Sequence, residues 1–422
     1  MSTSTKLSSA LPTTGRPLVR GAQASARSKD EMQIALMTGG FDKPYAYGMA
    51  MALAAHGVRL EVIGSDEVDN PEMHSSPVID FMNWQHGWRG DVGVFQKIIR
   101  QLNFYVRLLM YGARTKCRVF HILWNNKFVY VDRTLLMLYF RMLGKRITLT
   151  AHNVNTAKRD RRDSWLNRVT LKVQYRLADR IFVHTEKMRT DLISEFSVRP
   201  EAVTVIPFGI NNAALQTSLT PVEAKRKLGI REYERTILFF GRIQPYKGLE
   251  YLIEAFELLS SAEGSTYRLI IAGEPKKEYE QYWFGMRRRT ESGSLRDKVL
   301  QVIKYIPDDE TEVYFKAADA LVLPYTDIYQ SGVLFLGYSF GLPTIATDVG
   351  SFRDEIIPGE TGLICRPGDP ADLASAIERY FASAMYRELN GVRISIQAYA
   401  RRRYSWDLVA DITKRAYEEI QS

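Results

Sequence analysis

Short apolar runs alternate with longer amphipathic stretches along most of the chain. In the first half, the apolar runs predict strands at Gln33–Met37, Val58–Gly64, Arg118–Trp124, Arg146–Thr150, Arg180–His184 and Val203–Pro207. The stretches between them predict helices at about Ala46–His56, Val92–Ala113, Arg133–Leu143 and Ser164–Leu177. Strands that alternate with helices in this way are typical of a parallel sheet covered on both faces.

The same alternation of predicted strands and helices continues in the second half of the chain. Strands are predicted at Thr236–Gly241, Tyr267–Gly273, Val299–Tyr305, Ala320–Pro324 and Thr344–Thr347. Helices are predicted at Gly248–Leu259, Asp309–Ala317, from near Ser331, and at Trp406–Ile420. We therefore predict an α/β protein of two Rossmann-like domains, whose parallel sheets face a central cleft. The predicted parts are a disordered tail (1–30), an N-terminal domain (31–210), a C-terminal domain (211–400) that opens with a polar connection, Asn211–Arg231, and a closing helix (401–422) that belongs to either domain.

Composition and charge narrow the class of protein. The chain has 422 residues, of which 45% are hydrophobic, enough for a core in each half. The 57 Lys and Arg exceed the 48 Asp and Glu by a formal charge of +9, which favours anionic partners. This charge is spread out, without a concentrated basic arm, which argues against a nucleic-acid-binding protein. Cys117 and Cys365 lack metal-ligand or disulfide spacing, and no apolar run approaches the roughly 20 residues of a spanning helix, so we expect a reduced, cytoplasmic protein without a metal site.

The first motif follows the strand at Thr236–Gly241. Gly241 allows the backbone to approach a ligand, and two cations, Arg242 and Lys247, come directly after it. In open α/β sheets, ligands bind at the carboxyl ends of the strands. A guanidinium fork beside an ammonium group suits a diphosphate. The alternative interpretation of this segment alone is a solvated turn with two surface cations.

The second motif is a strand, a loop, and a helix that opens on Ser331, Gly332 and Val333. The free N–H groups and the dipole of a helix N-terminus form an anion site, and Gly332 permits close approach. The alternative is an ordinary helix capped by Ser331.

The third motif lies in the first half. His152 follows the strand at Arg146–Thr150, and from that position it can face the cleft and hydrogen-bond a sugar hydroxyl or stabilise developing charge. A structural histidine is the alternative. Gly39 and Gly40 follow the first strand, where they either admit a ligand or only relieve crowding between strand and helix.

Together these segments resemble a known family. The stretches AHN, IPFGI, GRIQPYKG and SFGLPTIATDVGSFRDEI follow one another in this order along the chain. Their order and spacing are similar to those of the retaining GT-B glycosyltransferases of family 4. The resemblance implies a nucleotide-sugar donor in the C-terminal domain, an acceptor in the N-terminal domain and no further cofactor. It also implies that Arg242 and Lys247 hold the diphosphate, that His152 reaches the transferred sugar, and that Gly39 and Gly40 approach the phosphates.

One segment departs from the family pattern. Members carry two glutamates separated by seven residues before an A-x-G-x-P segment, and alignment on Gly341 and Pro343 places Ile328 and Leu336 at those positions. The contacts of these glutamates with the sugar and the ribose are therefore in doubt. Asp327 or Gln330 can replace the first glutamate by a small loop shift, whereas no neighbour replaces the second.

These observations predict a metal-independent hexosyltransferase. It would use a UDP- or GDP-sugar with retention of configuration, act on a glycan or polyprenyl-diphosphate-linked acceptor, and serve polysaccharide or glycoconjugate biosynthesis. A catalytically silent sugar-nucleotide-binding protein is the alternative that the missing glutamates favour. A nucleotide-sugar epimerase of the same fold is less well supported, because the first domain lacks a clustered set of acids and bases.

Two predicted helices carry periodic cations. Arg100, Arg107 and Arg114 recur every seven residues, with Phe95, Leu102, Tyr105 and Leu109 between them, and Arg168, Lys172 and Arg176 recur every four. One interpretation is that this basic amphipathic face rests on an anionic membrane, which would place the protein peripherally on the inner face of the cell membrane. The other is that the apolar stripe packs on the sheet and the cations are solvated.

Overall fold

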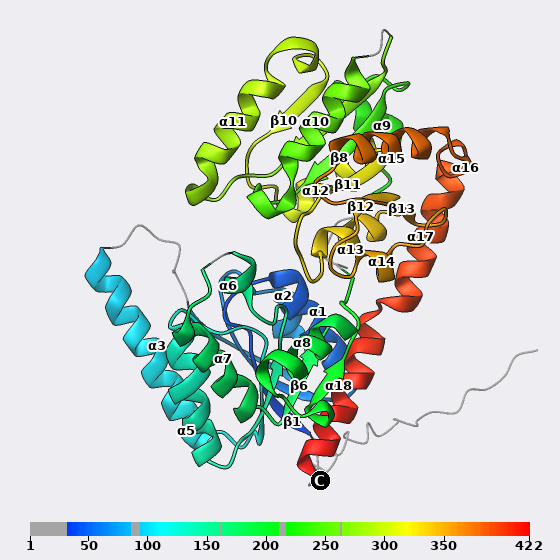
Figure 1. Ribbon diagram of the computed structural model, residues 1–422. Coiled ribbons are helices and arrows are strands. Elements are labelled where there is room, and N and C mark those ends of the chain that lie inside the picture. The colour runs from blue at the N-terminus through cyan, green and yellow to red at the C-terminus, as the bar shows by residue number, and fades with distance from the viewer. Residues whose placement is uncertain (1–31, 86–92, 161, 211–216, 262–263) are drawn as a thin grey trace, which may run out of the picture. The chain divides into compact units, whose positions relative to one another are not determined.

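The computed structural model describes residues 32–85, 93–160, 162–210, 217–261 and 264–422, and it contains two parallel sheets (Figure 1). The first sheet has the order β3-β2-β1-β4-β5-β6-β7 and the second the order β10-β9-β8-β11-β12-β13. The strands are β1 (Gln33–Met37), β2 (Arg59–Ser65), β3 (Ile79–Gln85), β4 (Val119–Ile122), β5 (Arg146–Thr150), β6 (Arg180–Val183), β7 (Val203–Val205), β8 (Arg235–Phe240), β9 (Tyr267–Ala272), β10 (Val299–Val302), β11 (Ala320–Leu323), β12 (Thr344–Thr347) and β13 (Gly362–Cys365).

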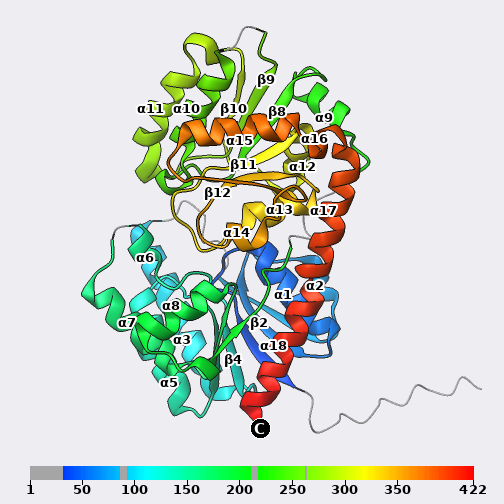
Figure 2. The same ribbon diagram turned by 45° about the vertical axis from the view of Figure 1, so that its right-hand side comes forward.

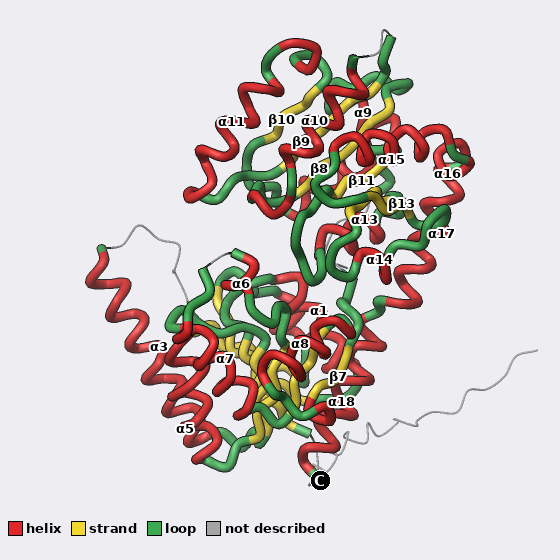
Figure 3. Tube along the Cα trace, viewed as in Figure 1, coloured by secondary structure: helices red, strands yellow, loops and turns green. Residues whose placement is uncertain are grey.

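Helices connect the strands and enclose both sheets (Figure 3). Around the first sheet they are α1 (Lys43–Ala55), α2 (Pro71–Ser75), α3 (Val94–Arg114), α4 (Val129–Val131), the π-helix η1 (Asp132–Leu136), α5 (Met137–Met142), α6 (Thr156–Arg159), α7 (Trp165–Leu177), α8 (Glu186–Phe196) and η2 (Pro200–Ala202). Around the second they are α9 (Pro221–Lys227), η3 (Pro245–Lys247), α10 (Leu249–Ser260), η4 (Lys277–Tyr279), α11 (Glu280–Thr290), η5 (Gly293–Leu295), α12 (Asp308–Ala317), α13 (Gly332–Ser339), α14 (Phe352–Glu355), α15 (Pro370–Ala382), α16 (Ala384–Arg387) and α17 (Leu389–Arg403). The chain closes with α18 (Trp406–Gln421).

The prediction of two Rossmann-like α/β units is confirmed. Apolar strands buried on both faces, such as β1 and β5, lie within the predicted limits. The edge strand β3 was not predicted, because its partly exposed positions dilute the apolar signal. The polar connection predicted at Asn211–Arg231 contains a helix in its described part, where the capping box of Thr220 and Glu223 starts α9.

Two hydrophobic layers cover the first sheet. On one face, α3, α5 and α7 pack their inner side chains, including Phe104, Phe140 and Leu171, against the strands. On the other face, α1 and α18 lie side by side (Figures 1 and 2). Trp406 of α18 packs so closely that a Cβ on Gly48 or Gly209 would overlap its indole ring. The closing helix is therefore part of the first sheet's covering layer.

Other sequence predictions concern the N-terminal tail, the domain boundaries, the two cysteines and membrane-spanning helices. The disordered tail predicted at 1–30 lies outside the described residues, and the domain boundaries at 210 and 400 stay predictions. Cys117 and Cys365 are both buried and unpaired. Among the described residues, no helix combines the length and the apolarity needed to cross a bilayer.

Candidate functional site

The carboxyl end of β8 brings the two predicted phosphate-binding motifs together. Gly241 has φ +94°, a left-handed conformation that favours glycine. A Cβ at this position would lie 3.0 Å from Nζ of Lys247 and 3.4 Å from Cγ2 of Val333. The loop after β8 and the first turn of α13 therefore converge on one place, although nearly a hundred residues separate them along the chain.

Lys247 is buried without a carboxylate partner. Its residue is 7% exposed, and its Nζ lies 5.4 Å from the centre of the Tyr325 ring. Within the described part of the chain, it has no ion pair with an acidic side chain. Burial, together with the positive charges of Arg159 and Arg242, lowers the pKa of Lys247 from 10.5 to about 8. A buried ammonium group beside two guanidinium groups favours the binding of an anion.

The two arginines near Lys247 lie in different halves of the chain. Arg242, predicted from the sequence, is exposed and has no ion pair among the described residues. Arg159 of α6 was not predicted, because it stands in a run of alternating charges that resembles a solvated surface. Its guanidinium group lies 4.3 Å from the centre of the Tyr246 ring and pairs with Asp160 at 2.7 Å. Arg159, on α6 in the N-terminal half of the chain, therefore places a third positive charge near Lys247.

The N-terminus of α13 is open to a ligand. Ser331 is buried, yet its side chain makes no capping hydrogen bond, and its Oγ lies 3.5 Å from the Tyr325 hydroxyl. The interpretation of Ser331 as an ordinary helix cap is therefore wrong. At Gly332 the nearest atom to a built Cβ is 3.8 Å away, on Phe208. Uncapped N–H groups at the start of a helix present partial positive charge to an anion.

The residues that depart from the family pattern lie in the loop before α13 and within α13 itself. Ile328 is 8% exposed and packs in the hydrophobic core, and Leu336 packs against the same core. Asp327 is exposed. Both amide atoms of Gln330 are shielded from solvent and have no hydrogen-bond partner in the described residues. Of the two predicted substitutes for the first glutamate, Gln330 is thus the one with unsatisfied polar atoms.

Replacement of Gln330 by methionine is expected to separate ligand binding from stability. The buried amide lacks partners without a ligand, so its removal should leave the melting temperature unchanged or raise it. The affinity for a sugar nucleotide should fall about tenfold, because one hydrogen bond to the ligand is lost. Thermal denaturation and calorimetric titration of the same preparation measure both effects. An equal loss of stability and affinity would show that Gln330 is a structural residue.

His152 lies among aromatic rings at the carboxyl end of β5. Its ring stacks on Trp124, with centroids 4.0 Å apart and planes inclined by 5°. Tyr45 meets it edge-on at 4.6 Å. A pocket of about 250 Å³ adjoins these residues and is also lined by Arg133, Gln174 and Tyr175. The arrangement provides a flat aromatic wall and polar groups, which suits a sugar-sized ligand.

Hydrogen bonds fix the protonation of His152. Burial lowers the pKa of His184 to about 4 and holds that of His152 well below its usual range, so both rings are neutral at pH 7. Nδ1 of His184 lies 3.3 Å from the Ile206 carbonyl oxygen, which can only accept, so this nitrogen carries the proton. Nε2 of His184 must then accept from Nδ1 of His152, at 3.3 Å. The Nε2 of His152 is left as a shielded lone pair without a partner among the described residues.

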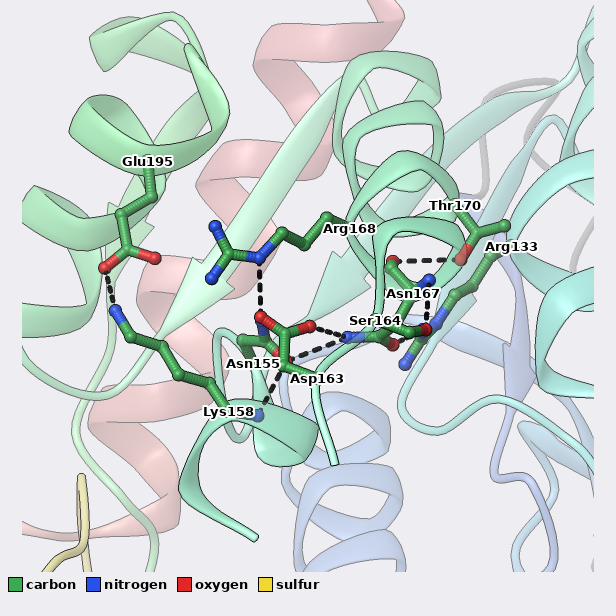
Figure 4. A network of polar contacts seen from close by, with 9 residues as sticks. All are labelled: Arg133, Asn155, Lys158, Asp163, Ser164, Asn167, Arg168, Thr170 and Glu195. Atoms are coloured by element: carbon green, nitrogen blue, oxygen red, sulfur yellow. Dashed lines mark hydrogen bonds and ion pairs between the residues drawn. The ribbon is translucent and has the colours of Figure 1, made fainter. Parts of the chain in front are cut away.

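A polar network holds the segment that follows His152 (Figure 4). The Asn155 side chain accepts a hydrogen bond from the Lys158 backbone N–H and another from Nδ2 of Asn167, at 3.0 Å. Asn167 in turn donates to Asp163 at 2.9 Å and accepts from Arg133 at 2.8 Å. This network ties α6, which carries Arg159, to α7 and to the pocket wall.

The glycine pair after β1 has a packing role. Gly39 and Gly40 both have positive φ, and a Cβ on Gly39 would lie 2.7 Å from Cβ of Trp124. A Cβ on Gly40 would overlap the Gln85 side chain. Close packing against Trp124, which follows β4, and against Gln85 of β3 therefore requires both glycines. Gly39 thereby contacts the same tryptophan as His152, whereas the predicted approach of these glycines to phosphate stays a prediction.

Two family models match the chain in succession. The model described as Glycosyltransferase Family 4 matches residues 44–213, and the model described as Glycosyl transferases group 1 matches residues 222–390. The D-inositol 3-phosphate glycosyltransferase of Acidothermus cellulolyticus is 30% identical over 233 residues, covering 54% of this chain and 51% of the relative. An uncharacterised glycosyltransferase of Methanocaldococcus jannaschii is 26% identical over 56% of this chain and 58% of its own. The matched stretch thus spans about half the length of these relatives.

Solved structures share the whole fold. The sucrose-phosphate synthase of Thermosynechococcus elongatus superimposes with a TM-score of 0.73 at 20% identity, covering 92% of this chain and 99% of that one. HepE of Anabaena, solved in complex with UDP-glucose, gives a TM-score of 0.70 at 16% identity over 92% of this chain and 100% of that one. The two family models together match most of the chain, so it belongs to the family 4 (group 1) glycosyltransferases, and the structural likenesses show the GT-B fold.

Proposed function

We propose that the chain transfers a hexose from a UDP- or GDP-sugar to a glycan or polyprenyl-diphosphate-linked acceptor. The observation that carries this proposal is Lys247, a buried cation that lacks a carboxylate and lies beside Gly241, Arg242 and the open start of α13. A diphosphate is the part of a sugar nucleotide that fits such a group of donors. Family membership supports a glycosyl transfer, and HepE is a relative in fold that binds UDP-glucose.

In the proposed reaction, negative charge grows on the departing diphosphate. Lys247, Arg242 and the N–H groups of Gly332 and Val333 stabilise that charge, each by about 3 kcal/mol in favourable geometry. These fixed donors take the part that a divalent cation plays in other transferases, so we expect activity in the presence of chelator. His152 accepts a hydrogen bond from a hydroxyl of the transferred sugar through its bare Nε2.

The replacement of the two family glutamates by Ile328 and Leu336 affects the expected stereochemistry of transfer. The positions of the two family glutamates hold Ile328 and Leu336, whose side chains have no carboxylate, so neither position supplies a nucleophile for a two-step displacement. We therefore propose transfer on one face of the sugar, with retention of configuration and without a covalent intermediate. The pocket beside His152, with Arg133 and Gln174 in its wall, is the proposed acceptor site.

The test is turnover with a panel of UDP- and GDP-sugars, measured as release of nucleoside diphosphate with and without candidate acceptors. Arg242→Ala and Lys247→Ala should both abolish most of this release. Turnover near the wild-type rate in both variants would overturn the site. Saturable binding without release or transfer, for every donor and acceptor, would instead favour the silent sugar-nucleotide-binding protein that Ile328 and Leu336 suggest.

A further inference from the structure

Exposed hydrophobic side chains gather on one layer of helices. Of the 24 large hydrophobic residues that stand exposed in the described part of the chain, 17 lie on α3, on residues 128–143, or at the start of α7. Scattered exposed hydrophobic residues are normal on a soluble protein, whereas a contiguous patch of this size marks an interaction surface. We call the outward side chains of these three segments the outer surface.

Helix α3 shows why this patch is not an extension of the core. Its inner side, with Phe104 and Leu108 almost fully buried, packs against the sheet. Its outer side carries a second stripe, in which Phe95 is 73% exposed, Leu102 56% and Val106 51%. The helix is thus apolar on two sides. Packing on the sheet explains only the first, so the interpretation in which the apolar stripe packs inward is wrong for Phe95 and Leu102.

The three segments lie next to one another on the same face of the first sheet (Figures 1 and 2). The Tyr105 hydroxyl donates to Asp132 at 2.8 Å, and the Tyr139 hydroxyl donates to the Leu109 carbonyl at 2.8 Å, which joins α3 to residues 128–143. Helix α7 in turn contacts both η1 and α5. The exposed stripe therefore continues across Leu135 and Met142 to Trp165, which is 77% exposed.

The charge of the outer surface is of one sign. Residues 94–114 and 165–177 contain no Asp or Glu. Asp132, the one acidic residue of 128–143, is buried against Tyr105. At 100° per residue, Arg107 and Arg114 border the outer apolar stripe of α3, and Lys172 and Arg176 follow Trp165 along α7. All four are exposed, and none forms an ion pair with the described residues.

We propose that the outer surface docks on an anionic lipid bilayer, with its apolar side chains in the headgroup region and its arginines and lysines on lipid phosphates. The combination of an apolar stripe and flanking cations complements such a membrane in both polarity and charge. A second copy of the chain does not complement it, because a symmetric contact would bring like charges together. Residues 1–29 carry only positive side chains among their charged residues and are equally unsuited to cover it.

The proposal concerns binding and does not depend on the proposed transfer reaction. If the acceptor is lipid-linked, docking would hold the N-terminal domain at the surface where the acceptor resides. Trp165, a large aromatic side chain at the start of α7, should lie at the level of the lipid headgroups. Its fluorescence should be quenched by lipids brominated near the headgroup, and Trp165→Phe should remove that quenching.

The test is flotation of the full chain with vesicles of phosphatidylglycerol and phosphatidylcholine in equal parts, without any sugar nucleotide. Wild-type protein should float with these vesicles, less so at high salt, and should not float with pure phosphatidylcholine. The variant Arg107→Gln, Arg114→Gln, Lys172→Gln, Arg176→Gln should bind almost three orders of magnitude more weakly, since each cation near an anionic surface contributes about fivefold. The variant Phe95→Gln, Leu102→Gln, Val106→Gln should also lose flotation while it keeps its melting temperature.

Matched control variants elsewhere on the chain should float like the wild type. One replaces four exposed arginines by glutamine at Arg288, Arg296, Arg401 and Arg402, and the other replaces Leu258, Phe284 and Ile394 by glutamine. The proposal is overturned if wild-type protein fails to float, if it floats equally with neutral vesicles, or if a control variant loses binding as the outer-surface variants do. It is also overturned if the outer-surface substitutions dissociate a dimer in light-scattering measurements. Loss of transfer activity alone would bear on the proposed function and not on docking.

Discussion

Replacement of Lys247 by methionine should lower kcat/KM for the sugar nucleotide by about a hundredfold to a thousandfold, the range seen when one oriented donor to a developing charge is removed. The reason is local. Lys247 and Val333 in the first turn of α13 both lie against Gly241, so the charge of Lys247 is close to the place where the diphosphate would sit. Steady-state kinetics on wild type, Lys247→Met and the exposed control Lys227→Met measure this effect. An unchanged kcat/KM in Lys247→Met would remove the residue from the site.

The same substitution should stabilise the ligand-free protein, with a defined pH dependence. Below about pH 8, the folded and unfolded chains both carry a charged Lys247, and the penalty of burying that charge is present in full. Between about pH 8 and the ordinary pKa of 10.5, the unfolded chain keeps the proton while the folded chain releases it, so wild-type stability rises with pH. The free energy of unfolding of Lys247→Met should therefore exceed that of the wild type by on the order of 3 kcal/mol at pH 7, and the two values should approach each other near pH 10. Chemical denaturation at both pH values measures the difference, and a variant less stable than wild type at pH 7 would contradict it.

Replacement of His152 by phenylalanine should lower kcat about tenfold to a hundredfold, because the sugar hydroxyl loses its acceptor and is left unpaired in a closed site. Phenylalanine preserves the stack on Trp124 and the edge contact with Tyr45, so the melting temperature should change little. Diphosphate affinity should also be retained, since His152 lies outside the cation group. Pre-steady-state rates and titration with nucleoside diphosphate separate the two effects, and equal losses in both would show that His152 acts through structure.

His184 provides a sharper test of the same hydrogen-bond chain. We expect no contact between His184 and the sugar. His184 sets the tautomer of His152 by accepting a hydrogen bond from its Nδ1. His184→Phe keeps the aromatic packing against Tyr45 and Phe208 while it removes that acceptor. The proton of His152 is then free to move to Nε2, which nitrogen NMR shifts report directly. A fall in kcat without a shift in the His152 tautomer would contradict the positioning role.

The extent to which the fold could be predicted depended on how completely each strand is buried. β1, β5 and β12 are buried runs of apolar or β-branched residues, and the predicted limits coincide with the observed ones. β3, at the edge of its sheet, mixes Asp80, Asn83 and Gln85 with hydrophobic residues and gives no such signal. The sequence of α3 shows periodic apolar residues, but only the burial of Phe104 and Leu108 in the structure shows which stripe faces the sheet.

The candidate site was predictable where its residues are contiguous. Gly241, Lys247 and the start of α13 lie in the segments that follow β8 and β11, and the rule that ligands bind at the carboxyl ends of strands indicates them. The same rule, applied to the end of β6, would have indicated His184. Arg159 gave no signal, because its role depends on how α6 reaches Tyr246 in the other half of the chain. Gln330 was one of two alternatives, and its buried, unpartnered amide distinguishes it from exposed Asp327.

The most direct measurement of the central claim counts protons taken up when a nucleoside diphosphate binds. At pH 8.5 a lysine with a pKa of about 8 is largely neutral, and a bound diphosphate should return it to the charged form. Calorimetric titration with UDP or GDP, in buffers of different ionisation enthalpy, should therefore show uptake of about three-quarters of a proton by the wild type. Lys247→Met should show weaker binding and no uptake. Tight binding without proton uptake by the wild type, or equal uptake by Lys247→Met, would contradict the account that Lys247 holds the diphosphate.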